Sequence, residues 1–310
     1  MYKRFLNKIK EFDKIVIYRH QRPDGDAMFS SLAIYTFLKD NFKDKKIKMA
    51  GFEDYDLISK RHKVSDNFIS DSLAIVVDTS RSDRIDDIRA MNSKFIVKID
   101  HHPVVDNYGD INIVDVKCAA ACEVIADILL SDVFKHYKFS NKFYEYLYCG
   151  IATDTINFKT TSTTAKTLHT ASILADRANL QISKLVEFLF DKDIDDFYKT
   201  TKIRSYFKTD KKMAYILLND KDLKNINIEA NEAKNHIDIM SNLKNINIWV
   251  FIVESEKLYD VSVRSKRGYV INKICQKYGG GGHANASGIK GIEYKQVKLL
   301  LKELVELSTK

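Results

Sequence analysis

Hydrophobic residues in the first half of the chain form short, nearly continuous runs separated by helical patterns. Leu-Ala-Ile-Val-Val at residues 73–77 is such a run, and a strand without alternating polar positions is buried on both faces. Strands that alternate with helices favour a parallel sheet, so we predict a doubly wound, mostly parallel α/β domain. The pattern predicts a helix from about Ala27 to Asn41 and strands over Lys14–His20, Ile47–Phe52, Leu73–Asp78 and Phe95–Asp100.

The second half of the chain repeats this alternation after a long helical stretch. From about Ala119 to Lys202 the pattern is mostly helical, and the charged segment Phe188–Phe197 favours a connecting helix. Further strands are predicted over Lys212–Leu218, Ile246–Glu254 and Leu258–Arg264, and helices over Asn231–Leu243, Val270–Tyr278 and Gln296–Leu307. We therefore predict a domain over residues 1–187, a helical connector over 188–204 and a smaller α/β domain over 205–310, with the active-site cleft between the two domains.

Composition narrows the class of protein further. The 310 residues include 45% hydrophobic and 30% charged residues, which is ordinary for a soluble globular protein. No apolar run reaches the roughly 20 residues of a membrane helix, and the N-terminus does not resemble a signal peptide, so we expect a cytoplasmic protein that does not bind membranes. The net charge of +8 fits anionic partners such as nucleotides. Four cysteines are too few for a disulfide framework, and Cys118 and Cys122 are predicted to lie in the core.

Acidic residues and histidines are concentrated where the predicted strands end. The first strand runs into His20-Gln-Arg-Pro-Asp24-Gly-Asp26, the third ends at Asp78, and the fourth ends in Asp100-His101-His102; Asp154 lies on a later helix. In open α/β sheets ligands bind at the carboxyl ends of the strands. Carboxylates together with imidazoles suit a pair of divalent cations, with Mn²⁺ favoured and Mg²⁺, Co²⁺ or Zn²⁺ as alternatives.

These clusters, in this order, resemble the motifs of the DHH phosphoesterase superfamily. The segment Gly279-Gly-Gly-Gly-His-Ala-Asn-Ala-Ser-Gly288 resembles the signature of its DHH-associated C-terminal domain. Within the superfamily, the two-domain layout is most similar to the bacterial oligoribonuclease (nanoRNase)/pAp phosphatases. The resemblance implies an enzyme that hydrolyses short RNA to mononucleotides and removes the 3′-phosphate of pAp (adenosine 3′,5′-bisphosphate) through a hydroxide bridging two metals. A cyclic or linear dinucleotide (c-di-AMP/pApA) phosphodiesterase and a non-catalytic nucleotide sensor are the alternatives, and the oligomeric state stays open, a homodimer included.

The resemblance also implies a role for each residue of the first domain. His20, Asp24 and Asp78 would hold one metal. Asp26, Asp78, His101 and Asp154 would hold the other, which makes Asp78 the bridge. Asp100 would orient His101, and His102 would contact the scissile phosphate or protonate the leaving oxygen. Two positions depart from the family pattern: Phe29 stands before Ser30 where a small residue such as glycine is usual, and Ile156 replaces a common glycine.

The glycine-rich segment is the candidate site of the second domain. Successive glycines allow backbone N–H groups to surround an anion, and Arg264 offers a planar donor pair suited to phosphate. By resemblance, Arg264, Ser265, Gly281, Gly282 and His283 would bind the nucleotide beyond the scissile bond. The first domain would then cleave the substrate and the second would hold it.

Overall fold

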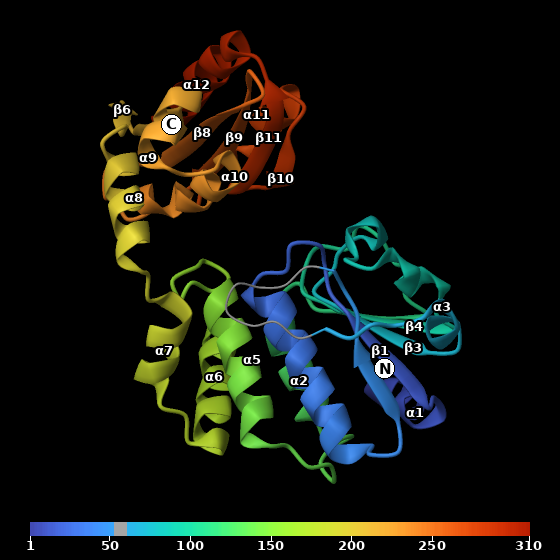
Figure 1. Ribbon diagram of the computed structural model, residues 1–310. Coiled ribbons are helices and arrows are strands. Elements are labelled where there is room, and N and C mark those ends of the chain that lie inside the picture. The colour runs from blue at the N-terminus through green and yellow to red at the C-terminus, as the bar shows by residue number, and fades with distance from the viewer. Residues whose placement is uncertain (53–60) are drawn as a thin grey trace. The chain divides into compact units, whose positions relative to one another are not determined.

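The chain folds into two compact units, Met1–Asp191 and Lys192–Lys310 (Figure 1). This computed structural model describes residues 1–52 and 61–310. The predicted strand over Ile47–Phe52 lies within the described range, but it is shorter than expected, because the strand there ends at Met49.

The first unit is built on a five-stranded parallel sheet with the strand order β2-β1-β3-β4-β5. The predicted parallel α/β fold is therefore confirmed. Alternate residues of the buried strands face two different cores: Ile15, Ile17 and Ile75 belong to one, and Val16 and Ala74 belong to the other. The strands are β1 (Lys14–Tyr18), β2 (Lys46–Met49), β3 (Leu73–Val77), β4 (Phe95–Asp100) and β5 (Ile111–Val114).

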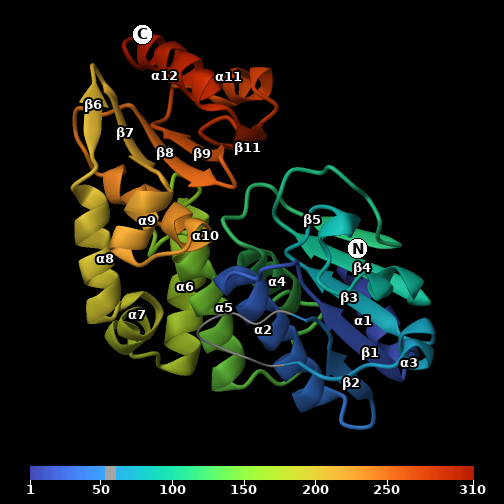
Figure 2. The same ribbon diagram turned by 45° about the horizontal axis from the view of Figure 1, so that its top comes forward.

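Helices cover both faces of this sheet, and the larger core lies under α1, α2, α4 and α5. Figure 2 shows α2, α4 and α5 side by side next to the sheet. The opposite face is covered by α3 and the 3₁₀ helix η2. The helices are α1 (Tyr2–Glu11), α2 (Gly25–Asn41), α3 (Asp66–Ser70), η1 (Ser82–Arg84), η2 (Ile88–Asn92), α4 (Ala121–Leu129), α5 (Asn141–Asp154), α6 (Ala165–Ala178) and α7 (Ile182–Phe190).

The strand order creates a natural ligand site. The chain leaves β1 toward β2 on one side and then returns to β3 on the other side of β1. At such a reversal the connections diverge, which leaves a crevice beyond the carboxyl ends of β1 and β3. The sequence places His20 after the first of these strands and Asp78 directly after the second.

The second unit contains a mixed six-stranded sheet with the strand order β10-β11-β9-β8-β7-β6. Strands β7 and β8 are parallel, whereas the other neighbouring strands are antiparallel. The strands are β6 (Lys208–Asp210), β7 (Met213–Leu218), β8 (Ile248–Ser255), β9 (Leu258–Ser265), β10 (Gly281–His283) and β11 (Ala286–Ile292).

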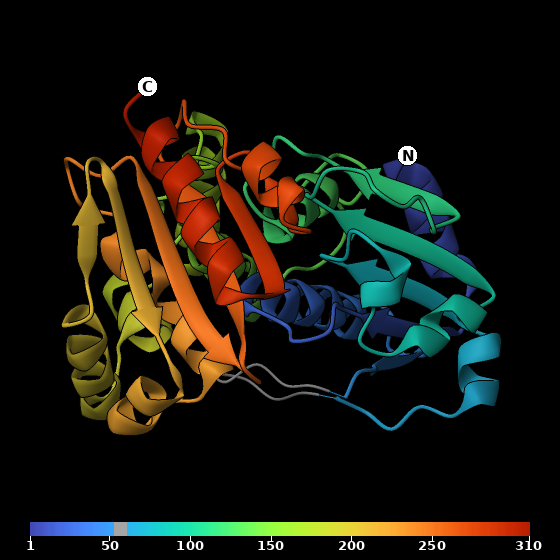
Figure 3. The same ribbon diagram turned by 90° about the horizontal axis from the view of Figure 1, so that it is seen from above.

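Helices also cover the two faces of the second sheet, and Figure 3 shows α12 lying across one of them. The single helix predicted over Asn231–Leu243 is instead a short α-helix that continues as a 3₁₀ helix. The helices are α8 (Ile194–Arg204), α9 (Asp220–Ile226), α10 (Ala230–Ala233), η3 (Lys234–Met240), α11 (Asn272–Lys277) and α12 (Tyr294–Ser308). In the described ranges, none of the helices is long and apolar enough to cross a membrane.

The predicted helical connector over 188–204 is not one continuous helix. Helix α7 ends at Phe190, and α8 begins at Ile194. The interruption has a local cause, because the Asp193 side chain accepts a hydrogen bond from the backbone N–H of Asp196 and so caps the N-terminus of α8. The division between the two compact units falls at this interruption.

Candidate metal centre

The first unit brings together the acidic residues and histidines that the sequence distributes over more than 130 positions. His20 follows β1, and Asp24 is the N-cap of α2, where its side chain accepts a hydrogen bond from the Ala27 N–H at 3.0 Å. Asp26 lies in the first turn of α2, and Asp154 is the last residue of α5. Asp78 directly follows β3 with a φ of 49°, a left-handed conformation that is uncommon for a residue other than glycine.

Asp78 contacts two histidines through different oxygen atoms. Its Oδ2 lies 3.4 Å from Nε2 of His20, and its Oδ1 lies 3.5 Å from Nε2 of His101. His20 also faces Asp24, with 3.7 Å between Nε2 and Oδ2, and His101 faces Asp154 at the same distance. Ligand atoms of His20, Asp24 and Asp78 lie within 4.8 Å of one another, and so do those of Asp26, His101 and Asp154. The arrangement is two adjacent groups of candidate ligands with Asp78 between them.

Burial and mutual repulsion disturb the titration of these carboxyl groups. Burial, together with the charges of Asp78 and Asp154, raises the pKa of Asp26 well above its usual value. Burial also raises the pKa of Asp154 to about 6, with a contribution from Asp78. Although burial alone would raise the pKa of Asp78, the adjacent imidazoles of His101 and His20 lower it. These carboxyl groups can therefore all ionise only if positively charged groups lie beside them.

The two histidines hold their protons strongly for the same reason. Burial alone would lower the pKa of His20, but the adjacent carboxylates of Asp24 and Asp78 raise it to about 11. For His101 the corresponding contributions from Asp78, with the charges of Asp26 and Asp154, raise the pKa to about 10. In the protein alone, protonated imidazoles thus supply the positive charge that the carboxylates require.

The residues fit a pair of divalent cations. Four carboxylates and two imidazole Nε2 atoms form the donor set, and the Oδ1 of Asp78, which is fully buried, has no hydrogen-bond partner. A buried, unpaired carboxylate oxygen is costly unless it binds a cation. Oxygen and imidazole donors together suit borderline divalent metals.

Metal binding is expected to release protons from this site. A cation can bind Nε2 of His20 and His101 only after their protons leave, so affinity must rise with pH below their pKa values. With one proton released per ion, the dissociation constant for Mn²⁺ should fall about tenfold per pH unit between pH 6 and 8. Calorimetric titration with Mn²⁺ in PIPES and in Tris, whose ionisation enthalpies differ, measures the release. Equal heats in both buffers would contradict the expected exchange of protons for metal.

Asp100 orients a different imidazole ring from the one that the sequence predicted. We expected it to orient His101, but its Oδ1 accepts from the ring Nδ1 of His102 at 2.9 Å and from the backbone N–H groups of His101 and His102 at 2.9 and 3.2 Å. The reason is local geometry: Asp100 ends β4, and the chain turns so that its side chain caps the next two N–H groups. His101 is thus held through its backbone, and its ring faces Asp78 and Asp154.

The sequence did not predict that the start of α4 holds the Asp26 side chain. The Asp26 carboxylate accepts hydrogen bonds from the backbone N–H groups of Ala121 and, at 3.0 Å, Cys122 at the start of α4. A Cβ atom at Gly150 on α5 would lie 2.2 Å from Sγ of Cys122 and 2.9 Å from Oδ1 of Asp26, and one at Gly25 would overlap Thr153. A glycine inside a helical pattern, as at Gly150, is the sequence signal that indicates such close packing.

The two departures from the family pattern affect different parts of the structure. Phe29 is 1% exposed, and its ring stacks on Tyr146 with 6.2 Å between the ring centroids, so it packs into the core. Ile156 lies two residues beyond α5 with a φ of 49°, and the N–H of Asn157 donates to the carbonyl of Ala152. This hydrogen bond closes a helix C-terminus of the kind that usually has glycine in the left-handed position.

Replacing Ile156 by glycine is therefore expected to stabilise the protein. A β-branched residue is strained in the left-handed conformation, and Ile156 is 43% exposed, so little packing is lost. The free energy of unfolding should rise by about 1 kcal/mol, since relief of the strain exceeds the entropy cost of glycine. Urea denaturation measures the change. Ile156→Ala keeps a Cβ but removes the branch, so it should show only part of this increase in stability. If Ile156→Gly were less stable than the natural protein, the turn would carry no strain.

The predicted nucleotide-binding residues gather at one end of the second sheet. His283 pairs with Ala286, and Ala286 pairs with Arg264, so these three residues form one row across β10, β11 and β9. Paired residues of antiparallel strands point to the same face. The alternate row on that face is Gly281, Gly288 and Ser262, which leaves a floor of small residues beside Arg264 and His283.

Gly282 and Ser265 contribute to this edge in other ways. Gly282 has a φ of 135°, and a Cβ there would lie 2.5 Å from the carbonyl oxygen of Ala286, so the strand requires glycine. The Ser265 hydroxyl donates to the carbonyl of Tyr269 at 2.6 Å and accepts from the side-chain amide of Asn285 at 2.8 Å. Ser265 thus holds the turn that follows β9, and its hydroxyl group is engaged inside the second unit.

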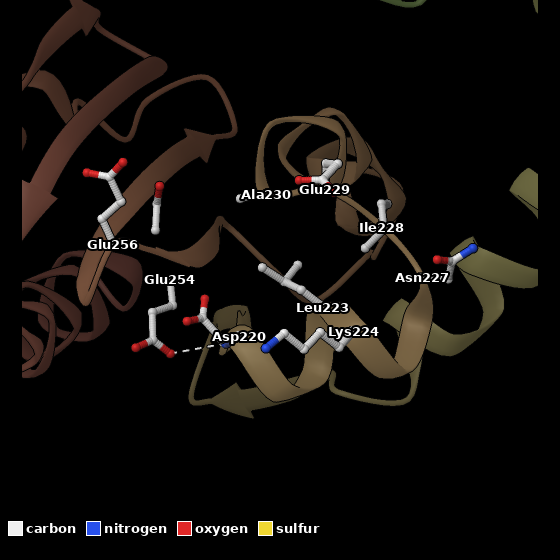
Figure 4. A pocket seen from close by; sticks show the side chains of 10 residues that line it. Asp220, Leu223, Lys224, Asn227, Ile228, Glu229, Ala230, Glu254 and Glu256 are labelled. Carbon is white, nitrogen blue, oxygen red and sulfur yellow. Dashed lines mark hydrogen bonds between the residues drawn. The ribbon is translucent and has the colours of Figure 1, made fainter.

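Two hollows differ in whether they suit an anionic substrate. One, of about 290 Å³, opens next to the metal-ligand candidates and is lined by Asp24, Gly25, Asp26, Thr153, Asp154, Leu189 and Phe190. The other, of about 370 Å³, lies in the second unit and includes Asp220, Glu229, Glu254 and Glu256 (Figure 4). The described residues around the second hollow do not form a metal-ligand group, and its carboxylates would repel a phosphate.

The fold and the site together define a metal-dependent phosphoester hydrolase. Residues 14–151 match the model of the DHH family N-terminal domain, and residues 210–310 match that of the DHHA1 domain. The chain belongs to the DHH family.

Its relatives specify the family further. The chain is 34% identical to the probable bifunctional oligoribonuclease and PAP phosphatase NrnA of Streptococcus mutans, over 97% of this chain and 99% of that protein. It is 30% identical to the bifunctional oligoribonuclease and PAP phosphatase NrnA of Bacillus subtilis, over 97% of each chain. The crystal structure of an exopolyphosphatase-related protein from Bacteroides fragilis superimposes with a TM-score of 0.88 at 23% identity, covering all of this chain and 97% of that one. The whole two-unit chain therefore shares the fold of that structure.

Proposed function

We propose that this protein hydrolyses short RNA oligonucleotides to mononucleotides and removes the 3′-phosphate of pAp. The contact of Asp78 with both His20 and His101 through separate oxygens is the observation that carries the proposal, because it prepares two adjacent cation sites. The names of the relatives from Streptococcus mutans and Bacillus subtilis support the choice of substrates. Both tasks break a phosphoester bond at a ribose 3′ oxygen, so one site can serve both.

The proposed ligands divide between two cations. His20, Asp24 and Asp78 would hold the first, and Asp26, Asp78, His101 and Asp154 would hold the second. When bound, such a pair supplies Lewis acidity to the phosphate and a water activated for attack. The mixture of imidazole and carboxylate ligands favours Mn²⁺ over Mg²⁺, since nitrogen donors suit the less hard of these two ions.

His102 is the residue proposed to act on the phosphate. Because Asp100 accepts from Nδ1–H of His102, the other ring nitrogen, Nε2, is the one that can contact a phosphate oxygen or give a proton to the leaving oxygen. The side chain of His102 is 37% exposed, which is more than the 13% of His20 and His101. This greater exposure fits a role at the substrate.

The second unit is proposed to bind the nucleotide away from the scissile bond. The row of Arg264 and His283 over small residues offers a guanidinium, an imidazole and exposed backbone to a phosphate and its ribose. Arg264 is half-buried, and this burial lowers the pKa of its guanidinium. Ser265 is proposed to assist by holding the neighbouring turn.

A product assay tests the proposal. Metal-free protein is supplied with Mn²⁺ and incubated with 5′-labelled RNAs from dinucleotides upward, pAp, c-di-AMP, pApA and pyrophosphate. Mononucleotides from the shortest RNAs and phosphate from pAp are expected, and EDTA should abolish both until excess Mn²⁺ is restored. Selective cleavage of c-di-AMP or pApA would instead indicate a dinucleotide phosphodiesterase. Metal and nucleotide binding without any product would indicate a sensor.

A further inference from the structure

A fully buried lysine lies directly behind the candidate metal centre. Lys98 is a residue of β4, and its side chain is 0% exposed. Its Nζ donates hydrogen bonds to the carbonyl oxygens of Ser80 at 2.8 Å and Asp106 at 3.0 Å, and it lies 3.3 Å from Oδ2 of Asp100. The same ammonium group stands over the ring of Tyr108 at 5.0 Å from its centroid.

Lys98 joins the two loops that present the proposed catalytic residues. Ser80 belongs to the loop that begins with Asp78, and Asp106 belongs to the loop that follows His101 and His102. Two further contacts join the same loops: the Tyr108 hydroxyl donates to the carbonyl of Thr79 at 2.7 Å, and the Ser82 hydroxyl donates to Asp106 at 2.6 Å. Of these groups, the ammonium group of Lys98 contacts both loops and Asp100.

Asp100 links Lys98 to His102, the residue proposed to act on the phosphate. Its Oδ2 faces Lys98, while its Oδ1 accepts from the ring of His102 and from the backbone of His101 and His102. The His102 Nδ1 lies 3.4 Å from Oδ1 of Asp78. The ring of His102 is therefore held between two carboxylates, and the one that binds it more closely is itself held by Lys98.

We propose that Lys98 is a positioning residue for phosphoester hydrolysis, which orients the ring of His102 by holding Asp100 and the two loops beside it in place. The inference rests on the proposed function, in which His102 acts on the phosphate. A buried charge is costly, and an apolar residue would satisfy β4 equally well. Lys98 is explained by its three polar partners, all of which lie on the segments that form the site.

Replacing Lys98 with methionine, which has a similar length but no charge, tests the proposal. Small displacements of a reacting group can lower turnover about a hundredfold, so kcat should fall by roughly that factor, while KM and the affinity for Mn²⁺ change less than about threefold. Lys98→Arg, which keeps the charge, should recover part of the loss. If Lys98→Met does not fold, Lys98→Gln, which keeps hydrogen-bond donors and loses the charge, is measured in its place.

A double-mutant cycle separates positioning from a structural role. If Lys98 acts through His102, adding Lys98→Met to His102→Ala should lower the remaining kcat by less than about threefold. Losses that multiply, or an unchanged kcat in the single variant, would overturn the proposal. Lys48→Met is the matched control, because Lys48 on β2 also lies over an aromatic ring and donates to a backbone carbonyl, but at the far edge of the sheet. It should leave kcat unchanged.

The substrate is chosen so that the two proposals can fail separately. With bis-p-nitrophenyl phosphate, a general phosphodiester whose leaving group needs no proton, turnover reports on the metal centre and on the contact of His102 with the phosphate, regardless of the natural substrate. Inactivity toward RNA and pAp, combined with a Lys98 effect on this diester, would reject the proposed substrates and keep the role of Lys98. Activity on RNA without any effect of Lys98→Met would keep the proposed substrates and reject the role of Lys98.

Discussion

Replacing Asp78 with alanine is expected to lower turnover of RNA and pAp by at least about 10³-fold, because a carboxylate that bridges two cations, the role proposed for Asp78, contributes several kcal/mol to the transition state. Asp78 is 2% exposed and contacts His20, His101 and His102, so its loss affects both groups of ligands at once. Steady-state assays in Mn²⁺ measure the rate, and equilibrium dialysis measures the number of bound ions. We expect weaker binding of both ions.

A nearby acidic residue provides the control for this experiment. Asp83 lies in η1, five residues beyond Asp78, and pairs with Arg81 on the surface. Asp83→Ala should leave turnover and the number of bound ions unchanged, since exposed ion pairs contribute little. Near-native activity of Asp78→Ala would show that the assignment of Asp78 as the shared ligand is wrong.

Gly150→Ala is expected to lower both stability and turnover, although Gly150 itself would hold neither metal nor substrate. The new Cβ would overlap Sγ of Cys122 and approach Oδ1 of Asp26, so α4, α5 or the Asp26 side chain must shift. Such overpacking costs about 2 kcal/mol of stability, and displacement of a ligand lowers turnover by roughly 10²-fold. Denaturant unfolding and Mn²⁺-dependent turnover measure the two effects.

A second substitution shows whether the steric conflict is the cause. Cys122→Ala removes the sulfur atom that the new Cβ would overlap, while the backbone N–H of residue 122 can still donate to Asp26. The double variant Gly150→Ala/Cys122→Ala should therefore recover part of the lost turnover, and Cys122→Ala alone should be nearly as active as the natural protein. If the double variant turned over substrate no faster than Gly150→Ala, the overlap with Sγ of Cys122 would not be the cause of the lost turnover.

Much of the fold could be predicted from local patterns. The run over 73–77 predicted a strand buried on both faces, and every residue of β3 is buried. The helix predicted from about Ala27 to Asn41 corresponds to α2, which begins two residues earlier because Asp24 provides the cap. The connecting helix predicted over Phe188–Phe197 is interrupted in the structure for a related reason. Its hydrophobic and charged pattern continues through Asp193, whose capping hydrogen bond begins a new helix there.

The sequence predicted which candidate residues come together at one edge of the sheet, but it did not predict all of the contacts between them. Residues at the carboxyl ends of neighbouring parallel strands must meet, so the strand pattern already brought His20, Asp78 and Asp100 to one edge. The hydrogen bond from Asp100 to the ring of His102 depends on how the chain turns after β4, and no periodicity encodes that turn. The importance of Gly150 depends on how closely α5 approaches Asp26 and Cys122, residues distant in the sequence.

The sequence by itself determined which groups were available and on which elements they lie: the buried strands, the acidic residues and histidines at their ends, and the glycines that permit close approach. The reason is that burial and secondary structure follow local patterns of polarity and backbone preference. The tertiary structure alone decided that Asp78 contacts two histidines through separate oxygens and that Lys98 reaches Asp100, Ser80 and Asp106 together. Such contacts depend on distances of a few ångströms between distant parts of the chain, which packing and strand order set.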